Sequence, residues 1–202
     1  MRVAAPDINA SNAHELFGHI RSVIGVILGL SVGRLLQGVA NIIEHPGARK
    51  LWWVHLGWVA WALIFVTCFW WWEFHLFQIR DWTIWKYFFL FLYSGLYFLV
   101  CTILFPASME GYAGYQQYLI ARRHAFFGFI AAIAILDVGD GLLKGIPYMQ
   151  ALGISYLVHT LLLLGLAIAG MLARRPAAHA AILLCALTEL LIWMFSAYDR
   201  LF

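Results

Sequence analysis

Four ionisable side chains lie inside long apolar stretches of this sequence, where a charged group is costly to keep. An ionisable residue in the hydrocarbon region of a membrane is rare, and it persists when it is paired or lines a polar cavity. Such residues are therefore the first candidates for chemistry. They are Arg34, Asp137, His159 and Glu189.

If the apolar stretches are membrane-spanning helices, these side chains lie at similar depths. Three connections carry an Ala-basic-basic triplet, at 48–50, 121–123 and 173–175, and these dibasic connections mark one end of the helices. Counted from that end at ~1.5 Å per residue, Asp137 and His159 lie ~20 Å deep and Glu189 lies ~18 Å deep. Arg34 lies ~12 Å deep, and its side chain leans toward the other three. We therefore expect one cluster of four side chains.

Such a cluster is suited to binding a proton or a small cation. Asp137 and Glu189 would take up and release the ion, and His159 would relay a proton because an imidazole exchanges protons near neutral pH. Arg34 would bias the charge of the carboxylates. The cluster predicts a channel or transporter for protons or a small cation. The alternative is a non-catalytic membrane subunit in which the same charges form a salt bridge that only fixes helix packing.

Two further charged residues follow Asp137 on the same helix face. Asp140 and Lys144 are four residues apart, a spacing that predicts an ion pair at the membrane interface. In the second apolar stretch, Trp52 and Trp70 are ~27 Å apart along a helix, the separation of two interfacial aromatic belts. Glu73 follows the second belt, so we expect it at a water boundary.

Histidines form two layers, which suggest a different class of protein. His55, His124 and His179 lie near the dibasic connections, whereas His19 and His75 lie near the opposite ends of the helices. Two such layers could hold haem b, so a haem-binding membrane redox protein is an alternative. No CxxCH or HExxH spacing occurs in the sequence, and the histidines therefore favour ordinary interfacial positions. We predict neither a metal nor a cofactor.

Glycine recurs every four residues in the first apolar stretch. Gly25, Gly29 and Gly33 form a GxxxGxxxG pattern, which removes side chains along one helix face and lets another helix approach closely. The partner helix belongs either to the same chain or to a second subunit. Because the chain is short and apolar, we expect a homo-oligomer.

The amino-acid composition indicates whether this protein is surrounded by water or by lipid. Of 202 residues, 64% are hydrophobic and 11% are charged, whereas soluble proteins average roughly 45–50% and 25%. This excludes a soluble enzyme and predicts the lipid bilayer as the surroundings. The net charge of +3 comes from scattered residues, so no basic stripe for nucleic acid exists. The cysteines lie in apolar runs without CxxC spacing, and they are Cys68, Cys101 and Cys185.

The fold class follows from the number and length of the apolar stretches. Each approaches or exceeds the ~20 residues that a helix needs to cross a membrane. We predict an all-α integral membrane protein: one six-helix bundle over 1–202, with a polar segment at 1–12 and both ends on one side. The three triplets suggest three helical hairpins, with a long interfacial connection at 106–123. The predicted spans are about 13–43, 51–78, 82–105, 124–143, 149–172 and 177–197.

Cation counts give an orientation. The three dibasic connections hold six cationic residues, against Arg2, Arg80, Lys144 and Arg200 at the opposite ends. This asymmetry places the dibasic connections in the cytoplasm, with a bacterial-type inner membrane as the expected location.

One further pattern resembles that of an enzyme family. Asp137-Val138-Gly139-Asp140 and Tyr198-Asp199 resemble the GxGD and YD motifs of intramembrane aspartyl proteases. Asp137 replaces the first glycine, however, and the two motifs occur in reversed order. The pattern therefore does not favour an enzyme.

Overall fold

The computed structural model describes residues 8–79 and 81–198, and this part of the chain consists of helices joined by short connections. Arg2, Arg80, Asp199 and Arg200, and residues 1–7 of the predicted polar segment, lie outside the described residues. The helices are α1 (Ile8–Glu44), α2 (Trp53–Trp72), the 3-10 helix η1 (Glu73–Gln78), α3 (Ile84–Leu104), α4 (Tyr115–Lys144), α5 (Ile146–Leu172) and α6 (Pro176–Tyr198).

The helices are compatible with a polytopic membrane protein. Six of them, with α2 and η1 counted together, are long and apolar enough to cross a membrane. Large apolar side chains are exposed on the outer surface of the bundle. Among them are Val26, Leu161 and Ile192, which are 63%, 59% and 64% exposed. A lipid bilayer would cover these side chains. The predicted all-α class is confirmed, as are six helices long and apolar enough to span a membrane.

The connection between the third and fourth spans is shorter than predicted. Helix α4 begins at Tyr115, so the triplet at 121–123 is helical and only residues 105–114 form the connection. Tyr118 and Leu119 are buried, which gives this first part of α4 an inward face. Gly114 lies against the backbone of Lys50, and the Tyr115 N–H donates to the Lys50 carbonyl at 3.2 Å. The first and third connections are therefore joined.

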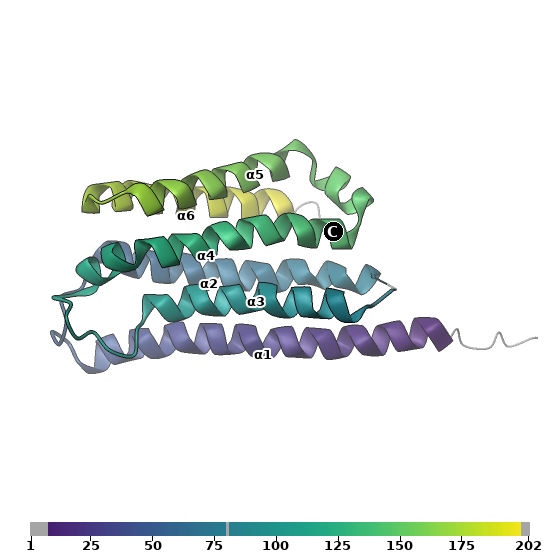
Figure 1. The fold of residues 1–202 in the computed structure, drawn as a ribbon, viewed down its shortest axis with the longest axis horizontal. Coiled ribbons are helices and arrows are strands. Elements are labelled where there is room, and N and C mark those ends of the chain that lie inside the picture. The colour runs from purple at the N-terminus through teal and green to yellow at the C-terminus, as the bar shows by residue number, and fades with distance from the viewer. Residues whose placement is uncertain (1–7, 80, 199–202) are drawn as a thin grey trace, which may run out of the picture.

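The helices form layers rather than separate hairpins. Figure 1 shows α1 along one side of the bundle and α5 with α6 along the other, separated by α2, α3 and α4. The largest interfaces are those of α4 with α5 and of α1 with α3. In both of these interfaces, the two helices belong to different predicted hairpins. Helix α1 begins and helix α6 ends at the same end of the bundle, opposite the dibasic connections (Figure 1).

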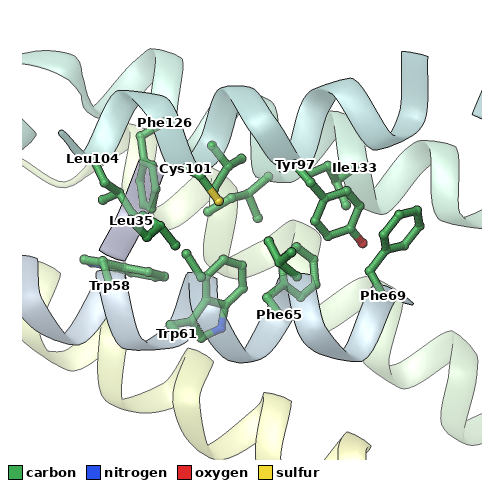
Figure 2. Packing of buried hydrophobic residues seen from close by; sticks show 14 of the residues in the cluster. Leu35, Trp58, Trp61, Phe65, Phe69, Tyr97, Cys101, Leu104, Phe126 and Ile133 are labelled. Carbon is green, nitrogen blue, oxygen red and sulfur yellow. The ribbon is translucent and has the colours of Figure 1, made fainter. Parts of the chain in front are cut away.

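Helix α2 supplies the centre of the core. Trp58, Trp61, Phe65 and Phe69 recur at helical spacing and face side chains of α3 and α4 (Figure 2). The rings of Phe69 and Tyr97 stack with centroids 4.2 Å apart. In a bilayer such packing, rather than the exclusion of water, holds helices together. The core therefore fixes α2 against α3, and both helices contribute to the site.

Two glycines shape the path from α4 into α5. Gly145 (φ 110°) separates the two helices, and Gly153 (φ 64°, ψ −158°) breaks α5 after its first two turns. Only glycine adopts the Gly153 conformation without strain. The segment Ile146–Leu152 consequently runs in a different direction from the rest of α5 (Figure 1).

Helix α3 begins with a capped and charged turn. The Thr83 hydroxyl accepts from the Lys86 backbone N–H, and the Lys86 ammonium binds the Asp81 carboxylate at 2.8 Å. The hydrogen bond from Lys86 lowers the pKa of the exposed Asp81. Asp81 lies outside the span and is exposed, whereas Lys86 belongs to the first turn of α3.

Candidate ion-binding site

Lys144, the last residue of α4, is the centre of a buried ion network. Its ammonium donates to Glu73 Oε1 at 2.9 Å and to Asp140 Oδ2 at 2.5 Å. The side chains of Lys144, Glu73 and Asp140 are only 2%, 6% and 4% exposed. The predicted Asp140–Lys144 pair is confirmed. Protein covers the pair and Glu73, so they are not exposed to water, and their position at the membrane interface stays a prediction.

The cover comes from η1 and from the first part of α5. Leu76 of η1 is 1% exposed, and Leu152 and Tyr148 of α5 line the same cavity as the ion network. The Lys144 ammonium lies 5.6 Å from the centre of the Tyr148 ring, within range of a cation–π contact. The break at Gly153 is what allows this segment to lie over the network.

Two oxygens in the network lack a donor. Glu73 Oε2 and Asp140 Oδ1 are buried, and neither receives a hydrogen bond from the described residues. The Glu73 and Asp140 carboxyl groups bond the same Lys144 ammonium, so they are neighbours in the network. Two ionised carboxylates are both acceptors, so a bond between them requires a proton on one. A proton on one of the two free oxygens would turn that acid into a neutral hydrogen-bond donor.

Asp137 lies one helical turn further into α4 and is held differently. The Tyr93 hydroxyl donates to its Oδ1 at 2.9 Å, and the Tyr156 hydroxyl donates to its Oδ2 at 2.8 Å. Both oxygens are thus occupied by donors, which suits an ionised carboxylate. Sequence reasoning missed these tyrosines. Their signal is the hydroxyl itself, since a buried tyrosine in an apolar span needs a partner for its O–H group.

A small cavity connects the two parts of the site. Its volume is about 30 Å³, enough for one or two water molecules between polar walls. Four charged residues line it, and we call them the carboxylate cluster: Glu73, Asp137, Asp140 and Lys144. Tyr97, Tyr156 and His159 also contribute to its wall.

His159 and Glu189 form a second pair beside this cavity. The His159 Nδ1 is hydrogen-bonded to Glu189 Oε1, and the imidazole stacks on the Trp193 indole with centroids 4.4 Å apart and planes at 11°. His159 lines the cavity of the carboxylate cluster, whereas both residues line a groove between α5 and α6. The structure therefore brings Asp137 and His159 to one cavity and places Glu189 just outside it.

Arg34 is not part of this arrangement. Its guanidinium donates to the carbonyl of Phe105, the residue that ends α3, at 2.5 Å. The carbonyls at a helix C-terminus lack intrahelical partners and carry partial negative charge. Arg34 therefore donates a hydrogen bond to a carbonyl at the C-terminal end of α3 that has no partner within the helix. The expected approach to Asp137 and Glu189 fails because α1 packs on α3, on the side of the bundle away from α5 and α6 (Figure 1).

The glycine pattern of α1 does not mark a contact within this chain. A side-chain carbon at Gly29 or Gly33 would meet open space, and one at Gly25 would touch only the Trp70 ring at 3.5 Å. A close approach occurs instead at Gly38, which lies against the Phe105 ring. The intrachain form of the prediction is wrong, and the approach of a second subunit stays a prediction.

The histidines near the dibasic connections have structural partners. His55 Nε2 bonds the Leu104 carbonyl at 2.7 Å, and His179 Nε2 bonds the Ala173 carbonyl at 3.1 Å. Both carbonyls lie at helix C-terminal ends, and His124 is exposed. Among the described residues no group of three or more His, Cys, Asp or Glu side chains is arranged to hold a metal ion.

Comparisons of the chain with protein-family models, with curated proteins and with solved structures found no match.

Proposed function

We propose that this polytopic protein transfers protons across its membrane through the carboxylate cluster, as a channel or transporter. One observation carries the proposal. Two buried carboxyl groups share a single ammonium, a third acid, Asp137, lines the same cavity, and the free oxygens of Glu73 and Asp140 receive no hydrogen bond from the described residues. A small cation in place of the proton is the closest variant of this function.

The charge balance supports a proton at this position. With all three acids ionised, the cluster would carry two negative charges in excess of Lys144. An uncompensated buried charge is costly, and a carboxyl group escapes that cost by binding a proton. A salt bridge with one acid for each base would leave no such surplus charge. The surplus of acids therefore favours proton uptake over a fixed packing role.

The second pair offers a continuation of the route. Asp137 is bonded to Tyr156, and His159 lines the same cavity one turn further along α5. An imidazole exchanges protons through either nitrogen, and Glu189 holds the ring of His159 at Nδ1. We infer a path from the carboxylate cluster through cavity water to His159 and Glu189.

The location of the carboxylate cluster along the helices indicates which membrane surface it is nearer to. Lys144 and Glu73 lie near the helix ends opposite the dibasic connections. We propose a bacterial-type inner membrane with those connections in the cytoplasm. The carboxylate cluster then lies toward the non-cytoplasmic surface, and Asp137 is the deeper member.

Proton flux into liposomes tests the function. The purified protein is reconstituted with an internal pH-sensitive dye, and flux is driven by a potassium diffusion potential. We expect flux from the unmodified protein, loss of most of it in Asp140→Asn, and no change in Asp81→Asn, which alters an exposed acid. A flux equal to that of empty liposomes, or one indifferent to Asp140→Asn in a folded protein, overturns the proposal.

Two other functions would give different results. A haem b protein would show a stoichiometric Soret band after purification. We do not expect this band, because His55 and His179 already bond carbonyls at helix ends. A non-catalytic subunit would show neither a Soret band nor flux.

A further inference from the structure

A groove between α5 and α6 opens on the outer face of the bundle. Its volume is about 770 Å³, within the range of small-molecule sites. From Ser155 to Leu166 it runs ~16 Å along α5. The groove begins just after the break at Gly153 and has mainly apolar walls. Six of the lining residues are Val158, Leu162 and Leu166 of α5 and Leu184, Thr188 and Ile192 of α6.

The lining of this apolar groove contains one pair of ionisable side chains. His159 and Glu189 are hydrogen-bonded to each other and only 8% and 9% exposed. Trp193, which also lines the groove, lies flat against the imidazole. The groove therefore combines apolar walls with the stacked rings of His159 and Trp193, and the imidazole of His159 can form hydrogen bonds.

The depth of the pair restricts what can bind it. Glu189 lies 13 residues after Pro176, which is ~20 Å from the dibasic end of α6 and therefore ~10 Å inside the opposite surface of a hydrocarbon core of ~30 Å. A phospholipid head group stays at the membrane surface, and a charged head group at this depth is costly. The ligand that fits is a neutral one dissolved in the bilayer.

The hydrogen-bonding state of His159 restricts the ligand further. Glu189 engages Nδ1, and no described residue bonds Nε2, which is therefore the nitrogen open to cavity water or to a ligand. Nε2 accepts from a hydroxyl when the ring is neutral and donates to a carbonyl when it is protonated. A quinone carries carbonyls and its reduced form carries hydroxyls, on a planar ring with an apolar tail. We propose that the α5–α6 groove binds a bilayer-dissolved quinone, with its head group at His159 and Trp193 and its tail between α5 and α6.

This inference does not depend on proton transfer at the carboxylate cluster, and binding can be measured without flux. The protein in phosphatidylcholine nanodiscs is photolabelled with an azido-ubiquinone that carries a decyl tail, and labelled peptides are identified by mass spectrometry. Decylubiquinone and decylbenzene serve as competitors, since they share a tail and differ in the carbonyl-bearing head group.

We expect labelling of α5 and α6 that decylubiquinone prevents and decylbenzene does not. Leu162→Trp should abolish labelling by filling the groove, whereas Leu161→Trp, on the adjacent exposed position outside the groove, should leave it unchanged. His159→Phe keeps the ring and removes its nitrogens, so binding should weaken about tenfold, as expected for one lost hydrogen bond.

Three results would overturn the inference. The first is equal competition by decylbenzene, which would show a nonspecific apolar surface. The second is an equal effect of Leu162→Trp and Leu161→Trp. The third is a stable dimer that dissociates on Leu162→Trp, which would show that a second copy of the chain occupies the groove.

Discussion

Lys144 supplies the positive charge on which two buried acids depend. Its ammonium bonds both Glu73 and Asp140, and the Tyr148 ring lies beside it. Removal of a base from a buried network leaves its acids without a counter-charge, whereas removal of one surplus acid leaves a balanced pair. The cluster should therefore respond very differently to the loss of its base and to the loss of one acid.

We expect Lys144→Met to lower the free energy of unfolding by about 3–5 kcal/mol. Glu73→Gln should lower it by only about 1 kcal/mol, because Asp140 and Lys144 remain paired. Thermal unfolding in detergent measures both. The triple variant Glu73→Gln/Asp140→Asn/Lys144→Met should recover much of the loss caused by Lys144→Met. Losses that simply add in the triple variant would contradict a charge network.

Sequence reasoning found the local part of this site and missed the distant part. Asp140 and Lys144 are visible as a pair because a helix places residues four apart on one face. The Lys144–Glu73 bond spans 71 positions and the Tyr93–Asp137 bond spans 44. No periodicity within one helix indicates which helices will be neighbours, and for the same reason Arg34 was expected near the wrong partners.

Helix α5 is the element that closes the site. Its first part, Ile146–Leu152, lies over the carboxylate cluster because the chain changes direction at Gly153. The sequence predicted the span itself from its apolar length, but a single glycine among apolar residues does not reveal a break. The break therefore became visible only from the backbone angles of Gly153.

We expect Gly153→Ala to destabilise the protein by about 1–3 kcal/mol, because alanine does not adopt the Gly153 conformation without strain. Gly165→Ala is the matched control, since Gly165 lies in the regular part of the same helix with open space around it. That change should be neutral or slightly stabilising. Equal unfolding temperatures for the two variants would show that the break is not required by the fold.

At the scale of the whole molecule, the layered bundle separates two kinds of polar side chain. Arg34, His55 and His179 bond backbone carbonyls toward the dibasic end, while the carboxylate cluster lies toward the opposite end. Apolar length and triplet position were enough to predict six spans and the end at which each connection lies. Which helices pack together depends on side-chain shape over the whole bundle, and the three-hairpin prediction did not include it.

The proposed orientation has a direct test in intact cells. In a Cys185→Ser background, a membrane-impermeant maleimide should label Asp81→Cys from outside and Ala48→Cys only after permeabilisation. Cys68 and Cys101 are buried and should stay unlabelled. The opposite pattern would reverse the orientation, and labelling of both positions from one side would contradict a span between them.

Infrared spectroscopy of the carboxyl groups tests the central claim, that the carboxylate cluster holds a proton. A protonated carboxyl group has a carbonyl stretching band that a carboxylate lacks, and the band shifts in heavy water. We predict such a band at neutral pH, absent from Glu73→Gln and from Asp140→Asn and retained in the exposed-acid control Asp81→Asn. A wild-type spectrum without this band, or a band that survives both cluster variants, would contradict the claim and leave the three acids as parts of a fixed salt-bridge network.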